Sequence, residues 1–189
     1  PGNLGGNQKQ LAFQTAFLHQ KHRLYCASGS NQSSKTAAVG GMCFCLYLRD
    51  YARDGDQFWV IAQTVDAHRD VPQGTLWQFL PKTMFPKDLT YEPRLGFGLI
   101  PTLTLTLPGQ RGICTVRFKS EDQSPNAYES ARLAGIWWTE CQAEWVLDLI
   151  QPRLARYGGW VLMDFVPLYG WHRYRLRIPA ETGNPDIFY

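Results

Sequence analysis

The sequence predicts an α/β fold, because apolar runs of strand length alternate along the chain with longer stretches of helical periodicity. Some of these runs, such as Phe58–Ala62 and Gly135–Trp138, are apolar at every position. Continuous apolar runs are typical of parallel strands that are buried on both faces of a sheet. No internal repeat follows the Gly- and Asn-rich beginning of the chain. We therefore expect a mostly parallel central sheet with helices on both faces.

The order of elements follows from the same periodicities. The expected strands are His22–Ala27, Gln57–Gln63, Leu103–Leu107, Ile113–Lys119, Gly135–Trp138 and Trp160–Phe165. The expected helices are Gln8–Gln20, Lys35–Arg53, Val65–Leu80 and Ala143–Tyr157. The second helix is apolar on nearly all sides, so it should pack directly against the sheet. The third and fourth strands are close enough in sequence to form a β-hairpin, and the Pro-rich segment before them is expected to be loop.

Composition favours a single globular domain and excludes a membrane-spanning protein. A chain of 189 residues with 44% hydrophobic and 19% charged residues suits one compact domain, residues 1–189. No apolar run approaches the roughly eighteen residues of a membrane span, and no secretory signal is recognisable, so we expect no membrane association and a cytoplasmic location. The five cysteines show no zinc-ligand spacing and are expected to be buried thiols. The net charge of +3 would not by itself indicate a nucleic-acid partner.

A segment between the first expected strand and the second expected helix has the pattern of a phosphate-binding loop. Its candidate phosphate-binding residues are Gly29, Ser30, Asn31, Gln32, Ser33, Ser34, Lys35 and Thr36. Gly29, Lys35 and Thr36 match G-x-x-x-x-G-K-[ST], whereas Ser34 replaces the second glycine and places a Cβ where the backbone approaches phosphate. In such a loop the lysine offsets phosphate charge and the threonine hydroxyl ligates Mg²⁺. A polar turn that caps a helix would have a similar composition, so that interpretation stays open.

The apolar strand that begins at Gly135 ends in a carboxylate, the usual placement of the second nucleotide-binding motif of ATPases. There an Asp normally holds the water shell of Mg²⁺, and the following Glu polarises the attacking water. Glu140 matches the catalytic position, while Thr139 occupies the position of the Asp and offers the metal a neutral hydroxyl. We expect this strand to be the direct neighbour of the strand that leads into the phosphate loop. A core strand that ends at solvent in a charged residue would look the same.

The next strand, Trp160–Phe165, leads into a Pro-x-x-Gly turn, and here the sequence resembles the ATPase domain of tailed-phage terminase large subunits. In that family a Thr-Pro-Leu-x-Gly type segment follows the strand and couples hydrolysis to DNA movement. Pro167 and Gly170 match this segment, and Asp164 and Val166 stand where the family has hydroxyl residues. A strand closed by an ordinary turn would also contain Pro and Gly.

Further segments resemble the family in the same order along the chain. Gln10 lies in a segment that resembles the one by which the family recognises adenine, a task for which a Gln side chain offers both a donor and an acceptor. A surface Gln on an N-terminal helix is the alternative for Gln10. The segment Lys119–Ser124 resembles one that faces phosphate or DNA in the family, although a solvated loop would explain it equally well.

The resemblance implies a P-loop NTPase of the additional-strand, catalytic-Glu type. It implies that ATP and Mg²⁺ are cofactors, with Lys35 and Glu140 catalytic and Thr36 and Thr139 near the metal. It also implies a packaging motor that moves double-stranded DNA into a procapsid in the host cytoplasm. The implied partners are a portal protein, a small terminase subunit and further copies of the chain in a ring. The nuclease domain of the family has no counterpart in these 189 residues.

Departures from the family pattern leave a second hypothesis open. Family members carry a basic residue inside the phosphate loop, where this sequence has Asn31 and Gln32. Arg132, or an arginine of another subunit, would have to replace it. Ser34, Thr139 and Asp164 are compatible with lost catalysis, and so with a non-hydrolysing module of the same fold that binds nucleotide or DNA. A structural subunit that binds neither is a third hypothesis.

Overall fold

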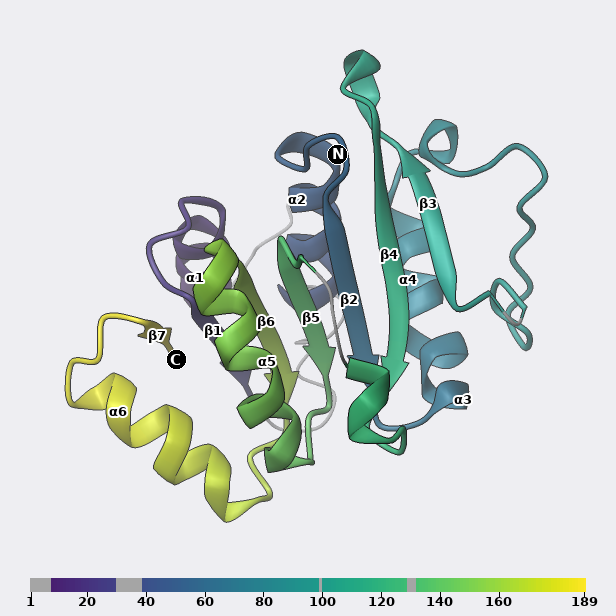
Figure 1. Ribbon diagram of the computed structural model, residues 1–189. Helices are drawn as coiled ribbons and strands as arrows, with labels where there is room; N and C mark the ends of the chain where they lie inside the picture. The colour runs from purple at the N-terminus through teal and green to yellow at the C-terminus, as the bar shows by residue number, and fades with distance from the viewer. Residues whose placement is uncertain (1–7, 30–38, 99, 129–131) are drawn as a thin grey trace.

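A seven-stranded sheet forms the centre of the molecule (Figure 1). The computed structural model describes residues 8–29, 39–98, 100–128 and 132–189. The strands are β1 (Leu24–Ser28), β2 (Gln57–Ala62), β3 (Thr102–Thr106), β4 (Ile113–Ser120), β5 (Gly135–Thr139), β6 (Trp160–Phe165) and β7 (Ile187–Phe188). They lie in the order β3-β4-β2-β5-β6-β1-β7, and every pair is parallel except the hairpin of β3 and β4. The expectation of a mostly parallel sheet is therefore confirmed.

Helices cover both faces of the sheet, as Figure 1 shows. The α-helices are α1 (Gln8–Leu18), α2 (Met42–Asp50), α3 (Val65–His68), α4 (Gly74–Phe79), α5 (Glu144–Tyr157) and α6 (Ile178–Glu181). The 3-10 and π segments are η2 (Arg69–Gln73), η3 (Lys82–Met84), η4 (Pro108–Gln110), η5 (Pro125–Tyr128) and η6 (His172–Arg177). Apolar residues of α1, α2 and α4 join one buried cluster, and those of α5 and η6 join the other. Neighbouring residues on a strand point to opposite faces, so Trp137 belongs to the first cluster and Trp138 to the second.

Local chemistry modifies two of the expected helices. The stretch expected as one helix from Val65 to Leu80 consists of α3, η2 and α4, with Pro72 inside the π-helical turn. Because Pro has no N–H to donate to the preceding turn, regular α-helical bonding is interrupted there. The second expected helix continues to Asp50, and residues 39–41 form a π turn before α2; its first residues lie outside the described part of the chain.

The C-terminal elements were not expected from the sequence. The segment after β6 forms η6 and α6, and the chain then returns to the sheet as β7, which pairs with β1. Strand β7 has two residues, too few to produce a periodic signal. All five cysteines are free and buried, as expected. Within the described part of the chain, every helix is too short or too polar to span a bilayer.

Candidate active site

Glu140 follows β5 directly and has a left-handed backbone conformation with φ of 49°. This conformation is uncommon for a residue with a Cβ and is frequent at functional sites. Two hydrogen bonds fix its peptide groups. The Glu140 N–H donates to the Asp164 carbonyl over 2.6 Å, and the Gln63 side-chain amide donates to the Glu140 carbonyl over 3.1 Å. The Glu140 side chain is partly exposed. The carboxylate is therefore presented at the carboxyl edge of the sheet by a constrained backbone.

Asp164 lies on β6 at the level of Thr139 on β5, and the two residues are partners in the parallel ladder. The Thr139 hydroxyl donates to Asp164 Oδ1 over 2.9 Å, and the Trp137 indole N–H donates to Asp164 Oδ2 over 2.6 Å. Asp164 is fully buried and Thr139 is 3% exposed. The carboxylate that β5 lacks at residue 139 is thus present on the neighbouring strand, in contact with the threonine that replaced it.

Gly29, the first residue of the predicted phosphate loop, and Gly40, shortly after its end, both lie against β6. Gly29 donates its N–H to the Phe165 carbonyl over 3.2 Å. Gly40 packs so closely on Asp164 that a Cβ there would come 2.9 Å from the Trp137 indole nitrogen, and closer still to Asp164 Oδ2. The segment from Ser30 to Thr36, with Lys35, lies outside the described residues. What the structure shows is that Gly29 and Gly40 both contact β6, the strand that carries Asp164.

Glycine at residue 40 is therefore a requirement of the packing, and Gly40→Ala should be destabilising. We expect the free energy of unfolding to fall by about 1–3 kcal/mol, because the added methyl overpacks a buried contact. Urea unfolding measures this change. Gly170→Ala is the matched control, since the nearest atom to a Cβ at Gly170 is 4.0 Å away. If the two variants unfolded at the same urea concentration, the close approach of Gly40 to Asp164 would be wrong.

The strand order corrects one expectation. We expected the strand that ends in Glu140 to be the direct neighbour of the strand that leads into the phosphate loop. Instead β6 lies between β5 and β1, so that Asp164 separates the two motifs. The three strands are parallel, so they all end at the same edge of the sheet, where ligands of open α/β sheets bind.

The turn after β6 connects this edge to the C-terminal helices. Pro167 and Gly170 are exposed, and Gly170 begins the helical segment that continues into η6. The next two side chains reach the residues after Glu140: the Trp171 indole donates to the Gln142 carbonyl over 2.9 Å, and His172 Nε2 lies 2.9 Å from the Cys141 carbonyl. Burial lowers the pKa of His172, so the neutral ring with Nε2 protonated fits this contact. The candidate coupling segment with Pro167 and Gly170 is thus linked by the Trp171 and His172 side chains to the loop that carries Glu140.

Gln10 lies in the first turn of α1 and is partly exposed. Near the other end of this helix, Phe17 contacts Trp160, the first residue of β6, with ring centroids 4.8 Å apart. One turn earlier, Gln14 donates to the Met42 sulfur at the start of α2, over 3.6 Å. Helix α1 therefore runs opposite to β1 and directs Gln10 toward the carboxyl edge. Its role in adenine recognition stays a prediction.

The structure corrects two interpretations of basic residues. Lys119 lies in β4, where it donates to the Ala127 carbonyl over 2.6 Å and packs 5.6 Å from the Trp59 ring, and its burial lowers its pKa. It belongs to the packing between β4 and η5 and does not lie in a solvated loop. Arg132 precedes β5 and therefore lies at the opposite end of that strand from Glu140, so within one chain it cannot replace the missing loop arginine.

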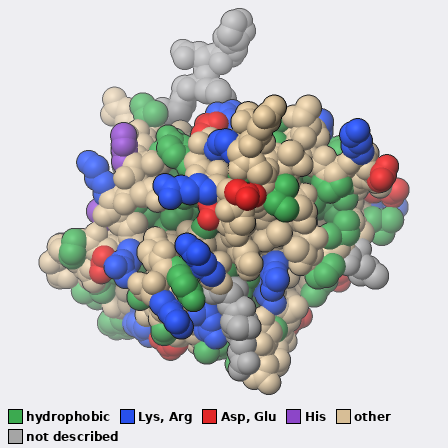
Figure 2. All heavy atoms as spheres, turned by 45° about the horizontal axis from the view of Figure 1, so that its top comes forward, with side chains coloured by type: hydrophobic (Ala, Val, Ile, Leu, Met, Phe, Trp, Pro, Cys, Tyr) green, Lys and Arg blue, Asp and Glu red, His purple; other side chains and the backbone are tan. Residues whose placement is uncertain are grey.

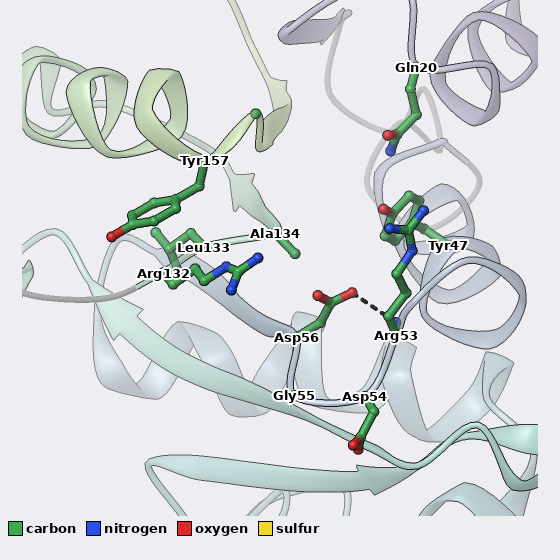
Figure 3. Close-up of a pocket in the computed structure, with 11 residues that line it drawn as sticks. Gln20, Tyr47, Arg53, Asp54, Gly55, Asp56, Arg132, Leu133, Ala134 and Tyr157 are labelled. Atoms are coloured by element: carbon green, nitrogen blue, oxygen red, sulfur yellow. Dashed lines mark hydrogen bonds between the residues drawn. The ribbon is translucent and has the colours of Figure 1, made fainter.

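Arg132 lines a cavity of about 430 Å³ at the amino edge of the sheet, between the starts of β2, β5 and β6 (Figure 3). Arg53 and Asp56 come from the turn before β2, and the Arg53 N–H donates to the Asp56 carboxylate over 2.8 Å. Figure 2, tilted toward this edge, shows Lys and Arg side chains scattered among acidic and apolar ones. This cavity is thus remote from Glu140 and does not contribute to the candidate active site.

Comparison with known proteins gives a fold. No protein-family model matches the chain, and none of the curated proteins does. Among solved structures, a large terminase from a thermophilic bacteriophage in complex with ADP superposes with a TM-score of 0.70 at 19% identity, covering 94% of this chain and 43% of that one. The large-terminase ATPase domain of Thermus phage P74-26 gives 0.59 at 20% identity, covering 92% and 68%.

The large terminase of bacteriophage HK97 gives a TM-score of 0.68 at 13% identity, covering 99% of this chain and 39% of that one. The chain thus spans less than half the length of the complete large terminases that it matches. At these identities the likeness concerns architecture, and it agrees with the strand order and the helix placement described above. The chain has the P-loop α/β fold of phage large-terminase ATPase domains.

Proposed function

We propose that this chain is the ATPase part of a DNA-packaging motor, which hydrolyses ATP to move double-stranded viral DNA into a procapsid. The carrying observation is the arrangement around the end of β6. Gly29, the first residue of the predicted phosphate loop, and Gly40, shortly after its end, both contact this strand, and its Asp164 carbonyl holds the Glu140 N–H. The fold likeness to large-terminase structures, of which two were solved with ADP and ATP-gamma-S, supports the same proposal.

In the proposed reaction, water attacks the γ-phosphorus in line with the bond to the β–γ bridging oxygen, which breaks to give ADP and phosphate. Glu140 orients the water and accepts its proton. Lys35 offsets the charge on the phosphates, and the backbone from Gly29 to Ser34 surrounds them. Gln10 contacts the base edge of adenine. The constrained backbone of Glu140 supports the catalytic role of its carboxylate, since catalysis requires that group at a defined position.

The residues around Asp164 fit a Mg²⁺ site. Magnesium prefers oxygen ligands and usually retains several waters. The Thr139 hydroxyl and the Asp164 carboxylate supply such oxygens at one level of the sheet, and the Thr36 hydroxyl is the third candidate. Bound Mg²⁺ would offset the negative charge of the β- and γ-phosphates. We propose that Asp164 supplies the negative charge that Thr139 cannot, through a hydrogen-bonded pair that replaces the usual single Asp.

The proposed partners follow from the packaging role. They are double-stranded DNA, the portal protein, a small terminase subunit and further copies of the chain in a ring, in the cytoplasm of the host. The turn with Pro167 and Gly170 is the proposed coupling element, because it is exposed on one side and continues into contacts with Cys141 and Gln142 on the other. An arginine from a neighbouring copy would supply the cation that Asn31 and Gln32 do not.

Phosphate release, measured with and without Mg²⁺ and double-stranded DNA, tests the proposal. We expect turnover that requires Mg²⁺ and that DNA accelerates. Calorimetry with ATP analogues separates the alternatives. Nucleotide binding without turnover under any condition would favour the non-hydrolysing module, to which the Ser34 and Thr139 departures point. Absence of nucleotide binding would contradict the proposed ATPase and favour a module that binds DNA alone or a structural subunit that binds neither.

A further inference from the structure

Glu121 lies just beyond the end of β4 and reaches the loop that carries Glu140. Its backbone N–H donates to the Ala62 carbonyl at the end of β2 over 2.9 Å, which fixes the residue to the sheet. The side chain is partly buried, and its two oxygens accept three hydrogen bonds. The donors are the Trp138 indole N–H at 2.6 Å, the Gln142 N–H at 2.9 Å and the Ala143 N–H at 3.1 Å.

These three donors flank Glu140 on both sides. Trp138 precedes Glu140 by two positions, and Gln142 and Ala143 follow it by two and three. One carboxylate therefore connects the end of strand β5 to the two peptide groups that precede α5. Ala143, at the N-cap position of α5, has no side chain that could cap the first N–H groups of the helix. A negative charge at the start of a helix is also favoured by the helix dipole.

The left-handed conformation of Glu140 gives the three hydrogen bonds of Glu121 a role in holding the catalytic loop as well as in stability. A left-handed residue with a Cβ persists only when surrounding contacts hold it. Here the Asp164 carbonyl and the Gln63 amide hold Glu140 itself, while Glu121 holds the residues before and after it. Burial raises the pKa of Glu121, and the three hydrogen bonds oppose that effect. Burial of the Glu121 carboxylate disfavours its ionised form, and the three hydrogen bonds to that form offset part of this cost.

We infer that Glu121 is a positioning residue for Glu140: its carboxylate holds both sides of the catalytic loop and thereby places the Glu140 carboxylate against the attacking water. This inference rests on the proposed ATPase function. Glu121 does not contact the substrate in this inference and acts only through the loop. Its removal should therefore lower kcat and leave nucleotide affinity unchanged.

A graded series of variants tests the inference. Glu121→Gln keeps the shape and two acceptor contacts but turns an amide N–H toward the Ala143 N–H, and Glu121→Ala removes all three acceptors. We expect kcat to fall several-fold in the first and roughly ten- to hundred-fold in the second, since small displacements of catalytic groups have effects of this size. KM and the Kd for an ATP analogue should stay within about two-fold.

Two controls separate positioning from stability. Asp122→Asn changes the neighbouring exposed carboxylate and should retain the wild-type kcat. Leu154→Ala opens the core under α5 without touching the Glu140 loop, so it shows what a destabilised helix alone does to kcat. Equal kcat in folded Glu121→Ala and wild type, or an equal loss in Leu154→Ala at matched Tm, would overturn the inference. If Glu121→Ala does not fold, the same comparison is made with Glu121→Gln. A wild-type chain without turnover would instead contradict the proposed function.

Discussion

Replacing Glu140 by Gln should lower ATP turnover by about two to four orders of magnitude while leaving nucleotide affinity within about two-fold. The amide has nearly the shape of the carboxylate, so the backbone contacts with Asp164 and Gln63 should persist. It cannot accept the proton of the attacking water, however, and it carries no negative charge to orient it. Single-turnover phosphate release and calorimetry with an ATP analogue measure the two quantities separately.

Lys35→Ala provides the contrasting phenotype. Lys35 is proposed to offset triphosphate charge in the ground state as well as in the transition state, so its loss should abolish detectable binding. If Lys35→Ala bound nucleotide as the wild type does, the segment after Gly29 would be an ordinary polar turn. If Glu140→Gln turned over at the wild-type rate, another group would activate the water.

The strands of the site could be predicted from the sequence because their burial leaves a local signal. Trp160–Phe165 was expected with the same bounds as β6, and Gly135–Trp138 falls one residue short of β5. Strands covered on both faces are apolar at every position, which makes them easy to recognise. The position of Glu140 at the end of such a strand followed directly from this pattern.

The order of the strands in the sheet could not be predicted from these local apolar patterns. Nothing local to β6 indicates that it lies between β1 and β5, since pairing depends on side chains far apart in the sequence. This order decides the chemistry, because it brings Asp164 into contact with Thr139. A residue that the family resemblance assigned to the coupling motif is thereby also part of the candidate metal site.

The residues that hold the Glu140 loop were missed for the same reason. Gln63 is 77 positions from Glu140, and Trp171 is 29 positions from Gln142. Each looks like an ordinary polar or aromatic residue at the end of a strand or in a helix. Glu121 was included in a segment that resembles the family, yet its function there depends on donors from β5 and α5. Sequence patterns report the position of the catalytic carboxylate, whereas its supporting contacts require the tertiary structure.

The pairing of Thr139 with Asp164 predicts that restoring the usual acid by Thr139→Asp will be destabilising. The two carboxylates would meet in a site where Thr139 is 3% exposed and Asp164 fully buried, at about the separation that now joins Oγ1 to Oδ1. Repulsion between such charges is on the order of 6 kcal/mol at the effective dielectric constant of protein sites. Urea unfolding at pH 7 should show the loss, and lower pH, which allows one carboxylate to be protonated, should recover part of it.

Combining Thr139→Asp with Asp164→Asn should restore the stability. The new amide oxygen can accept the Trp137 indole N–H, and the amide N–H can donate to the new carboxylate, so every polar group regains a partner. If negative charge at this level of the sheet is what the metal requires, the double variant should turn over at least as fast as the wild type, whereas Asp164→Asn alone should lose turnover. An unimpaired Thr139→Asp single variant would mean that Asp164 is already neutral in the folded protein. In that case Asp164 could not supply the charge that Thr139 lacks, and the non-hydrolysing module would become the better account of the fold.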